Sequence, residues 1–341
     1  MEVVEWLLAG DPSVRWQAVR DLTDAPGEQI ARERARVAGE GWGAHLLEAQ
    51  REDGHWEVTS PEFDPESPAA KWWDALQPGQ KGTLMPAGTS TTWSLALLRA
   101  FGVDPEDEAV RRAVARVAEH CLWEHDGQRY FDGEVEPCIN GRAVALGAYF
   151  GQSVAPIVRR LLGEQMEDGG WNCEQENGST RGSFHTTIDV LEGLLEFETA
   201  ARAGWGGQAA DADLIEQVEW ARLKGQEYLL ERRLMNSRST GKPIEQDRKT
   251  EARATWTQFS FPTYWHYDVL RALDYLRAAD ARPEERMADA IDLVESKRDQ
   301  SGRWPAEHRH PGRLHFPLDD GEGEPSRWNT LRALRVLRWY R

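Results

Sequence analysis

The 341-residue sequence predicts an all-α fold made of repeated helix hairpins, and two observations support this prediction. Apolar residues recur every three to four positions in several segments, which is the spacing of one face of an α-helix, whereas alternating runs of β-branched residues are absent. A motif in which a glycine turn precedes a tryptophan also recurs between these segments. The chain has 16 tryptophans but only 7 tyrosines, so the architecture repeatedly uses a large ring with one N–H donor.

The expected elements follow in order along the chain. Residues 6–22, WLLAGDPSVRWQAVRDL, predict a helix hairpin, and residues 1–40 as a whole are expected to cap the array. The turn motif then occurs as LLEAQREDGHW (46–56), LLGEQMEDGGW (161–171) and LVESKRDQSGRW (293–304), with a weaker copy at 120–131. Each copy predicts the end of an outer helix, because glycine accepts the left-handed conformation of a tight turn without steric cost.

Five further segments predict inner helices, at 91–102, 138–151, 184–197, 265–279 and 327–341. Small residues within them, such as Gly147 and Gly193, permit close contact between helices, which suits an inner layer. Helix pairs of this kind cannot bury their apolar faces alone. They are therefore expected to stack on their neighbours as an open solenoid or a closed ring.

The pattern Q-x-x-x-G-x-W resembles a repeat found in known proteins. It occurs as QREDGHW (50–56) and QMEDGGW (165–171), and it resembles the repeat of squalene and hopene cyclases and of protein prenyltransferase β subunits. Over roughly residues 40–341 the chain more closely resembles uncharacterised bacterial proteins labelled squalene-cyclase-like. The resemblance implies a single α/α toroid domain over residues 1–341. It does not define the activity, because one fold hosts many chemistries.

The chain lacks the motifs that carry function in these families. Class II terpene cyclases protonate their substrate with a D-x-D-D motif, and this motif is absent from the chain. The acidic stretch PLDDGEGE (317–324) is predicted to be a solvated turn. Prenyltransferase β subunits hold zinc with an aspartate, a cysteine and a histidine, but their Asp-x-Cys spacing is missing here. Lanthipeptide cyclases, another toroid family, use two cysteines and a histidine, and their adjacent Cys-His pair is missing as well.

The sequence nevertheless predicts a zinc site of its own. When the inner helices are aligned by their apolar cores, Cys138 and His185 occupy the same position, five residues before cores that begin at 143 and 190. Cys173 follows Trp171 in the intervening loop and is expected to reach the same rim. Two thiolates and one imidazole are suitable zinc ligands and leave a fourth position for water or substrate. The alternative is that the cysteines are buried as small apolar residues and the histidine caps a helix.

The same alignment predicts a polar ring around a central cavity. The position before each apolar core is Arg142, Asp189, Asp268 or Asn329, and Trp93 in the remaining helix. We expect these residues to line the cavity, because unpaired polar groups are costly to bury. Asp189 and Asp268 are the candidate catalytic acids or bases, and Arg142, Asn329 and Trp93 the candidate substrate-binding residues. The alternative is that the two aspartates only stabilise the first turns of their helices through the helix dipole.

His266 and Tyr267 open the next predicted inner helix. They are candidates for substrate binding at the cavity mouth, although aromatic residues at such positions more often belong to the core. Asp189 lies four residues after His185, hence on the same helical face, so it is also expected to orient that histidine, to act as a fourth metal ligand or to serve as a general base.

Composition excludes several classes of partner. A formal net charge of −17 disfavours nucleic acid or an anionic membrane surface, since both reward clustered Lys and Arg. No apolar stretch is long enough to span a membrane, and three cysteines do not form a disulfide framework, so we expect a cytoplasmic protein with reduced thiols. The sequence leaves open whether the chain has a partner subunit.

These observations favour a zinc-dependent enzyme of transferase or cyclase type. Its expected substrate is small and isoprenoid-like or thiol-bearing, or a peptide. Two alternatives remain at this stage. One is a metal-free terpene cyclase-like enzyme that uses aspartic acids, and the other is a non-catalytic toroid that binds a hydrophobic ligand or a peptide.

Overall fold

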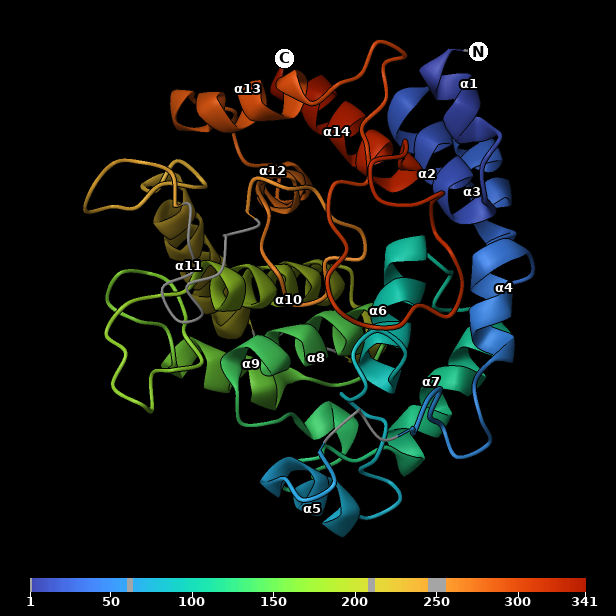
Figure 1. Ribbon diagram of the computed structural model, residues 1–341, viewed down its shortest axis with the longest axis vertical. Helices are drawn as coiled ribbons and strands as arrows, with labels where there is room; N and C mark the ends of the chain where they lie inside the picture. Colours follow the sequence, from blue (N-terminus) through green and yellow to red (C-terminus); the bar gives the residue numbers. More distant parts are fainter. Residues whose placement is uncertain (1, 60–63, 208–211, 245–255) are drawn as a thin grey trace.

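The computed structural model describes residues 2–59, 64–207, 212–244 and 256–341. Over these ranges the chain is helical, with three isolated β-bridges and no β-strand (Figure 1). The predicted all-α class is confirmed.

Helices surround an axial cavity of about 290 Å³. Five of them are the expected inner helices, α6 (Thr91–Phe101), α8 (Pro137–Tyr149), α10 (Phe184–Arg202), α12 (Val269–Ala278) and α14 (Arg327–Tyr340). Helix α2 (Pro12–Leu22) packs on α14 and completes the ring, because Gln17 donates a hydrogen bond of 2.9 Å to the carbonyl of Ala100 in α6. All six contribute side chains to the cavity wall, so the arrangement is the α/α toroid expected from the repeat.

An outer layer covers this ring. It consists of α4 (Gly41–Glu48), α7 (Glu108–His120), α9 (Ala155–Gly163), α11 (Ala212–Leu230) and α13 (Ala288–Ser296). Helix α9 packs on α8, α11 on α10, and α13 on α12, so each of these hairpins buries its apolar face between the two layers. Short 3₁₀ turns occur at Tyr130–Asp132, Trp205–Gly207 and Glu285–Met287.

The tryptophan of the turn motif makes the same hydrogen bond in all three full copies. The indole N–H of Trp56, Trp171 or Trp304 donates, at 2.6–2.7 Å, to the carbonyl ten residues earlier, in the last turn of the outer helix. The glycine two residues before each ring has a φ of 81–85°, a conformation that other residues adopt only with strain. The motif therefore terminates the outer helix and buries a ring beneath it.

The glutamine of the motif ties neighbouring outer helices together. The side-chain amide of Gln50 donates to its turn glycine at 3.0 Å and to the carbonyl of Ala113 in α7 at 2.9 Å. Gln165 does the same with its turn glycine and with Ala221 of α11, both at 2.8 Å. The third copy has Arg298 at the equivalent place, and its guanidinium lies over the ring of Trp304.

Glycines bring α8 and α10 into close contact at the centre of the molecule (Figure 1). A Cβ atom added to Gly193 would lie 2.3 Å from the carbonyl oxygen of Gly141, a distance that side-chain carbon atoms do not adopt. The prediction that small residues in the inner helices permit close packing is confirmed at Gly193. This contact places the N-terminal halves of the two helices side by side.

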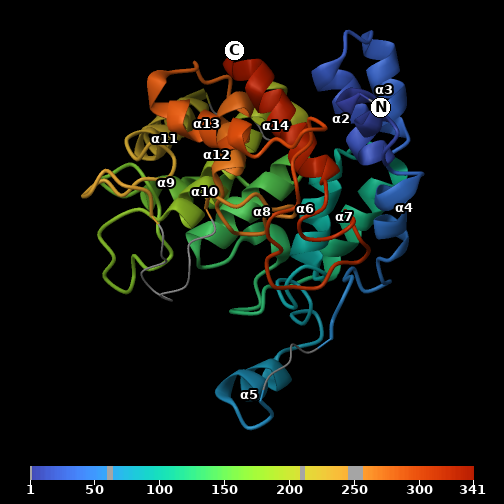
Figure 2. The ribbon, with the colours of Figure 1, turned by 45° about the horizontal axis from the view of Figure 1, so that its top comes forward.

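Two elements differ from the sequence-based expectation. The fourth inner helix was predicted to begin at residue 265, but α12 begins at Val269 because the Asp268 side chain caps it, accepting from the backbone N–H of Arg271 at 2.7 Å. The expected N-terminal cap contains α1 (Val3–Leu8), α2 and α3 (Gly27–Ala35), and of these α2 belongs to the ring itself. Helix α5 (Pro68–Ala75) projects away from the body (Figure 2).

Candidate functional site

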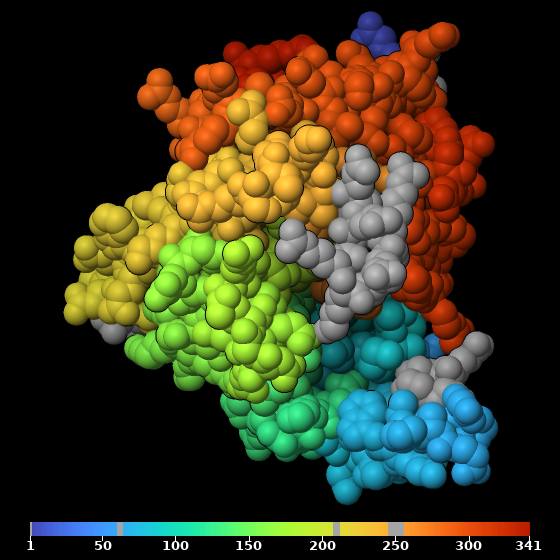
Figure 3. Space-filling model, turned by 60° about the vertical axis from the view of Figure 1, so that its left-hand side comes forward, coloured from blue at the N-terminus to red at the C-terminus, as the bar shows by residue number. Residues whose placement is uncertain are grey.

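Cys138 and Cys173 meet at the rim of the toroid. Cys138 is the second residue of α8, and Cys173 lies in the loop between α9 and α10. Their sulfur atoms are 2.7 Å apart, compared with about 2.05 Å in a disulfide bond, and both thiols are free. Both residues are partly exposed, and the loop that carries Cys173, in light green in Figure 3, lies on the molecular surface. The pair is therefore accessible to solutes.

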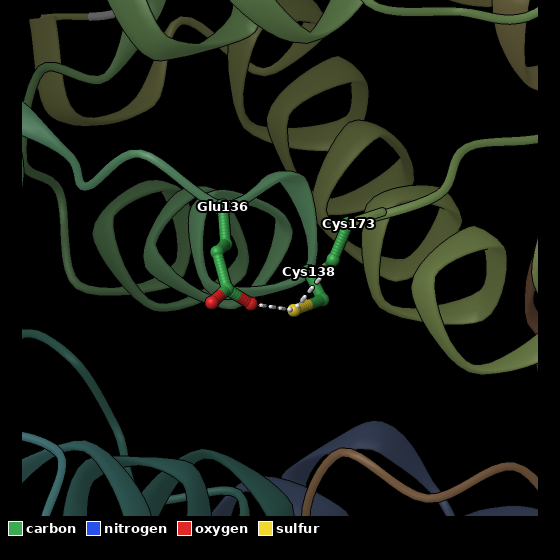
Figure 4. A group of neighbouring side chains, drawn as sticks. All are labelled: Glu136, Cys138 and Cys173. Carbon is green, nitrogen blue, oxygen red and sulfur yellow. Dashed lines mark hydrogen bonds between the residues drawn. The ribbon is translucent and has the colours of Figure 1, made fainter. Parts of the chain in front are cut away.

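Glu136 completes a group of three potential metal ligands. Its Oε2 atom lies 3.5 Å from Cys138 Sγ, and one ligand atom from each of Glu136, Cys138 and Cys173 lies within 4.8 Å of the other two (Figure 4). No other trio of histidine, cysteine or acidic side chains in the described ranges meets this criterion. Sequence reasoning missed Glu136. The available signal was its position at the N-cap of α8, two residues before a cysteine in the first turn.

His185 does not join this group in the structure. Its Nδ1 accepts the backbone N–H of Tyr267 at 2.8 Å, and its Nε2 lies 3.3 Å from the indole nitrogen of Trp256. The next residue, Thr186, faces the thiols instead, with its hydroxyl 3.4 Å from Cys173 Sγ. One residue rotates a helical side chain by about 100°, so the two neighbours point in different directions. Cys138 and His185 are each the second residue of their helix, but their side chains face different neighbours.

The surroundings of the thiols favour their protonated forms when no cation is present. The hydrogen bond with Cys173, together with burial, raises the pKa of Cys138 well above its usual value. A bound metal cation would reverse this preference, because coordination deprotonates a thiol. The third cysteine, Cys121, is 1% exposed and belongs to the core, and burial raises its pKa to about 12.

The axial cavity is a second polar feature and is distinct from the cysteine pair. The cysteines and Glu136 are not part of its wall. The wall is rich in charged side chains, namely Arg99, Arg142, Glu192, Glu196, Arg271, Asp274, Arg277, Arg332 and Arg335. Of the predicted polar ring, Arg142 and Trp93 line the cavity.

The other three members of the predicted ring are buried beside the cavity and do not line it. Asp189, Asp268 and Asn329 are at most 1% exposed, and the wall residues lie three positions later, at Glu192, Arg271 and Arg332. The loop at 259–264 explains the offset because it fills the N-terminal end of the ring. The amide of Asn329 donates to the carbonyl of Phe259 at 3.1 Å, and Arg142 donates to that of Tyr264 at 2.7 Å.

The charged wall residues could have been found from their spacing. Glu192 and Glu196, Arg271 and Asp274, and Arg332 and Arg335 lie three or four residues apart within otherwise apolar helices. Such pairs share one helical face. A charged stripe on helices that are apolar elsewhere indicates an internal polar surface.

The carboxyl groups near the cavity differ in the direction of their pKa shifts. Burial raises the pKa of Asp189, although Arg271 and Arg142 oppose the rise, and its Oδ2 atom has no hydrogen-bond partner. Burial also acts on Glu192, but there the charges of Arg271 and Arg142 dominate and hold the pKa at about 2. Burial raises the pKa of Asp268 as well, and its Oδ2 atom also lacks a partner.

The two aromatic candidates before α12 have different surroundings. The Tyr267 side chain is fully buried and donates to the carbonyl of Leu234 at 2.6 Å, so it does not line the cavity. The ring of His266 stacks on that of His310 with 3.6 Å between centroids, and burial lowers the pKa of His266 to about 3. Trp265 is 39% exposed, so part of its aromatic ring is accessible at the rim where the inner helices begin.

The fold and its polar sites define an all-helical toroid with a thiol and carboxylate cluster at one rim. No model of a known protein family matches the chain, and no curated protein matches it. Among solved structures, the apo form of the type II terpene cyclase MstE from Scytonema is similar, with 17% sequence identity, coverage of 92% of this chain and 98% of that chain, and a TM-score of 0.33. At this level of similarity no functional conclusion follows.

Among the helices of the described segments, none is long and apolar enough to cross a membrane.

Proposed function

We propose that the chain is a zinc-dependent enzyme with its metal site at the rim of the toroid and with Cys138 and Cys173 among the ligands. The observation that supports this most strongly is the meeting of two free, partly exposed thiols and one carboxylate, whose ligand atoms lie within 4.8 Å of one another. Zinc prefers sulfur, nitrogen and oxygen donors of this kind.

The residues fit a zinc ion after a small movement. Zinc–sulfur bonds of about 2.3 Å in a tetrahedral site separate two sulfur atoms by roughly 3.8 Å. The sulfurs are now 2.7 Å apart, so they must open by about 1 Å. Cys173 lies in a loop and can move, while the first turn of α8 holds Cys138. Glu136 is the third ligand that the structure favours. His185, the ligand expected from sequence, would first have to release its hydrogen bond from the N–H of Tyr267.

Three protein ligands would leave one position open, which is typical of catalytic zinc sites. A zinc ion there would supply a Lewis acid that lowers the pKa of a bound water or a substrate thiol. The chain itself would orient the thiols, since the Thr186 hydroxyl lies 3.4 Å from Cys173 Sγ. The exposed face of Trp265, near the same rim, would contact an apolar part of the substrate.

The charged axial cavity narrows the class of substrate. A hydrocarbon chain inside it would desolvate several arginines without offering them hydrogen bonds, which is costly. We therefore favour a thiol-bearing substrate at the rim over a polyprene in the cavity. A transferase that alkylates or acylates a substrate thiol would use the proposed site in this way.

The first experiment is metal analysis of the protein purified without a histidine tag. We expect about one zinc per chain, and loss of it in Cys138→Ser and in Cys173→Ser. Cys121→Ala is the matched control, because this thiol is buried elsewhere and should leave the zinc content unchanged. Glu136→Gln and His185→Gln identify the third ligand. Absence of metal in the wild type after zinc is supplied would refute the proposal.

A second candidate function is acid catalysis by Asp189 or Asp268 without a metal. It is favoured by the raised pKa of both carboxyl groups and by the unpartnered Oδ2 atom of each. Against it, neither residue lines the cavity, and Asp189 accepts hydrogen bonds from two arginines. A metal-free wild type that converts polyprenes, and loses this activity in Asp268→Asn, would establish this function. A metal-free and inert protein that co-purifies with lipid or peptide would indicate a binding role.

A further inference from the structure

The outward face of α11 carries the two most exposed large apolar side chains in the described part of the chain. Trp220 is 62% exposed, and Leu223, three residues later, is 47% exposed. The other exposed positions of this helix lie three or four residues from these two, so they form one stripe along its surface. Single apolar side chains on a surface need no explanation, whereas neighbouring ones indicate a binding surface.

A surface groove of about 600 Å³ adjoins Trp220, between α11 and α9. Leu162 of α9 and Ala221 of α11 give its wall an apolar part, and Trp220 itself stands at its side. A protruding ring beside a groove is self-complementary under a two-fold rotation. The Trp220 ring of one copy can enter the groove of a second copy, and the reverse contact then forms at the same time.

The charges beside Trp220 have the same symmetry. Glu216 and Lys224 lie four residues before and after it, about 6 Å away along the helix axis in opposite directions. Within the described ranges, neither side chain forms an ion pair or a hydrogen bond. In an antiparallel second copy of α11 centred on Trp220, Glu216 lies opposite the partner's Lys224, and Lys224 lies opposite the partner's Glu216. Two pairs of opposite charge therefore flank the central rings.

The ends of the stripe limit the strength of such an association. Asp213 and Glu227 lie seven residues before and after Trp220, so in the antiparallel arrangement each lies opposite a carboxylate of the other kind. Arg286 donates to Glu227 at 2.5 and 3.1 Å but also pairs with Glu284, so it only reduces this repulsion. Each chain also carries a formal net charge of −17. We therefore expect association of moderate affinity.

We propose that α11 binds a second copy of this chain, with two antiparallel α11 helices packed around a two-fold axis at Trp220. The apolar contact is made by Trp220 and Leu223 with the groove beside α9, and the Glu216 and Lys224 pairs fix the antiparallel direction. This inference goes beyond the zinc site, because Glu136, Cys138 and Cys173 are not part of the groove wall.

Sedimentation equilibrium of the full-length protein measures the dissociation constant of the dimer. A phosphine reductant is present, so that a disulfide between chains cannot imitate the interface. Trp220→Ala removes the central ring. Glu216→Lys and Lys224→Glu each place like charges opposite one another in both pairs, whereas the double variant restores opposite charges. Glu48→Lys, at an exposed position of α4, makes the same change of charge elsewhere and is the control. All four side chains are exposed, and circular dichroism confirms that each variant is folded.

We expect a wild-type dimer with a dissociation constant on the order of micromolar. Trp220→Ala and each single charge reversal should weaken it by about tenfold or more, and Glu48→Lys should leave it unchanged. The double variant should return to within about threefold of the wild type. A wild type that is still monomeric at about 0.2 mM would overturn the proposal. So would a dimer that withstands Trp220→Ala, or a double variant that remains as weak as the single ones.

Discussion

Arg271 on α12 holds Glu192 on α10 through two parallel hydrogen bonds, from Nε to Oε1 at 2.8 Å and from Nη2 to Oε2 at 2.7 Å. The same guanidinium also bonds Asp189, at 2.7 Å. Arg271 is 4% exposed, so this bidentate pair is a buried link across the ring between two helices. The charge of Arg271 lowers the pKa of Glu192 and opposes the rise that burial causes in the pKa of Asp189.

Loss of this guanidinium should destabilise the fold strongly. Arg271→Met would leave the buried Asp189 and the half-buried Glu192 with Arg142 as their remaining ion-pair partner among the described residues, and we expect a loss of about 3–5 kcal/mol in the free energy of unfolding. Urea denaturation followed by circular dichroism measures it. Arg112→Met, which removes an exposed pair on α7, should cost no more than about 0.5 kcal/mol. Similar losses in the two variants would contradict a structural role for the buried pair.

The glutamine of the turn motif should contribute to stability through its two carbonyl contacts. Gln165→Ala removes both bonds and leaves the carbonyls of Gly169 and Ala221 without this donor, so we expect a loss of about 1–3 kcal/mol. Gln217→Ala, at an exposed position of α11, is the control and should change stability by less than about 0.5 kcal/mol. A neutral Gln165→Ala would show that the motif acts through its tryptophan alone.

Glu124 should give the fold a measurable pH dependence. It is 5% exposed, and burial raises its pKa from 4.5 to about 7, although the backbone N–H groups of Met85 and Leu84 oppose the rise. Between these two values the folded protein binds a proton that the unfolded chain has released. The free energy of unfolding therefore falls as the pH rises from about 4.5 to about 7, and this contribution is constant outside that window.

The variant Glu124→Gln isolates this contribution, because the amide oxygen can accept the same two backbone N–H groups. At pH 8 the variant should be more stable than the wild type by up to about 3 kcal/mol, and at pH 4.5 the difference should be smaller. Denaturation curves at four pH values provide the comparison. Parallel pH profiles for the two proteins would rule out the buried carboxyl group as the source.

The cysteine pair should oxidise selectively. Diamide accepts two electrons and two protons from two thiols and yields a disulfide and a hydrazine. Because Cys138 and Cys173 are only 2.7 Å apart, we expect one intrachain bond between them and a free Cys121. Mass spectrometry after alkylation detects the loss of two hydrogen atoms. Bound zinc should slow the reaction, whereas a bond that involves Cys121 would be inconsistent with the structure.

The helical architecture could be predicted because its signals are local. Apolar spacing located the inner helices, and the turn motif located the ends of the outer ones. The start of α12 was misplaced because Trp265 and Tyr267 extend its apolar pattern, although Asp268 caps the helix. Whether a side chain caps a helix depends on the direction of the backbone there. The spacing of apolar residues does not indicate that direction.

The site was harder to predict because it depends on rotation about helix axes. Cys138 and His185 are each the second residue of their helix, but Thr186, one residue after His185, is the side chain that faces the thiols. Three of the five members of the predicted polar ring were displaced by three residues for a different reason. The loop at 259–264 fills the N-terminal end of the ring. A contact between segments so far apart in the sequence cannot be recognised from the spacing of apolar residues within a helix.

The contacts of Gln17 bear on the order in which the helices of the ring come together during folding. Its amide donates to Ala100 of α6, and its carbonyl oxygen accepts from Arg335 of α14 at 3.1 Å, so one side chain joins an early helix to the helix that follows all others of the ring. During synthesis on the ribosome, α2, α6, α8 and α10 emerge long before α14 does. Until α14 arrives, the charged faces of these helices remain open to water, and the axial cavity does not exist. The wall of the cavity therefore cannot be complete before α14 has joined α2.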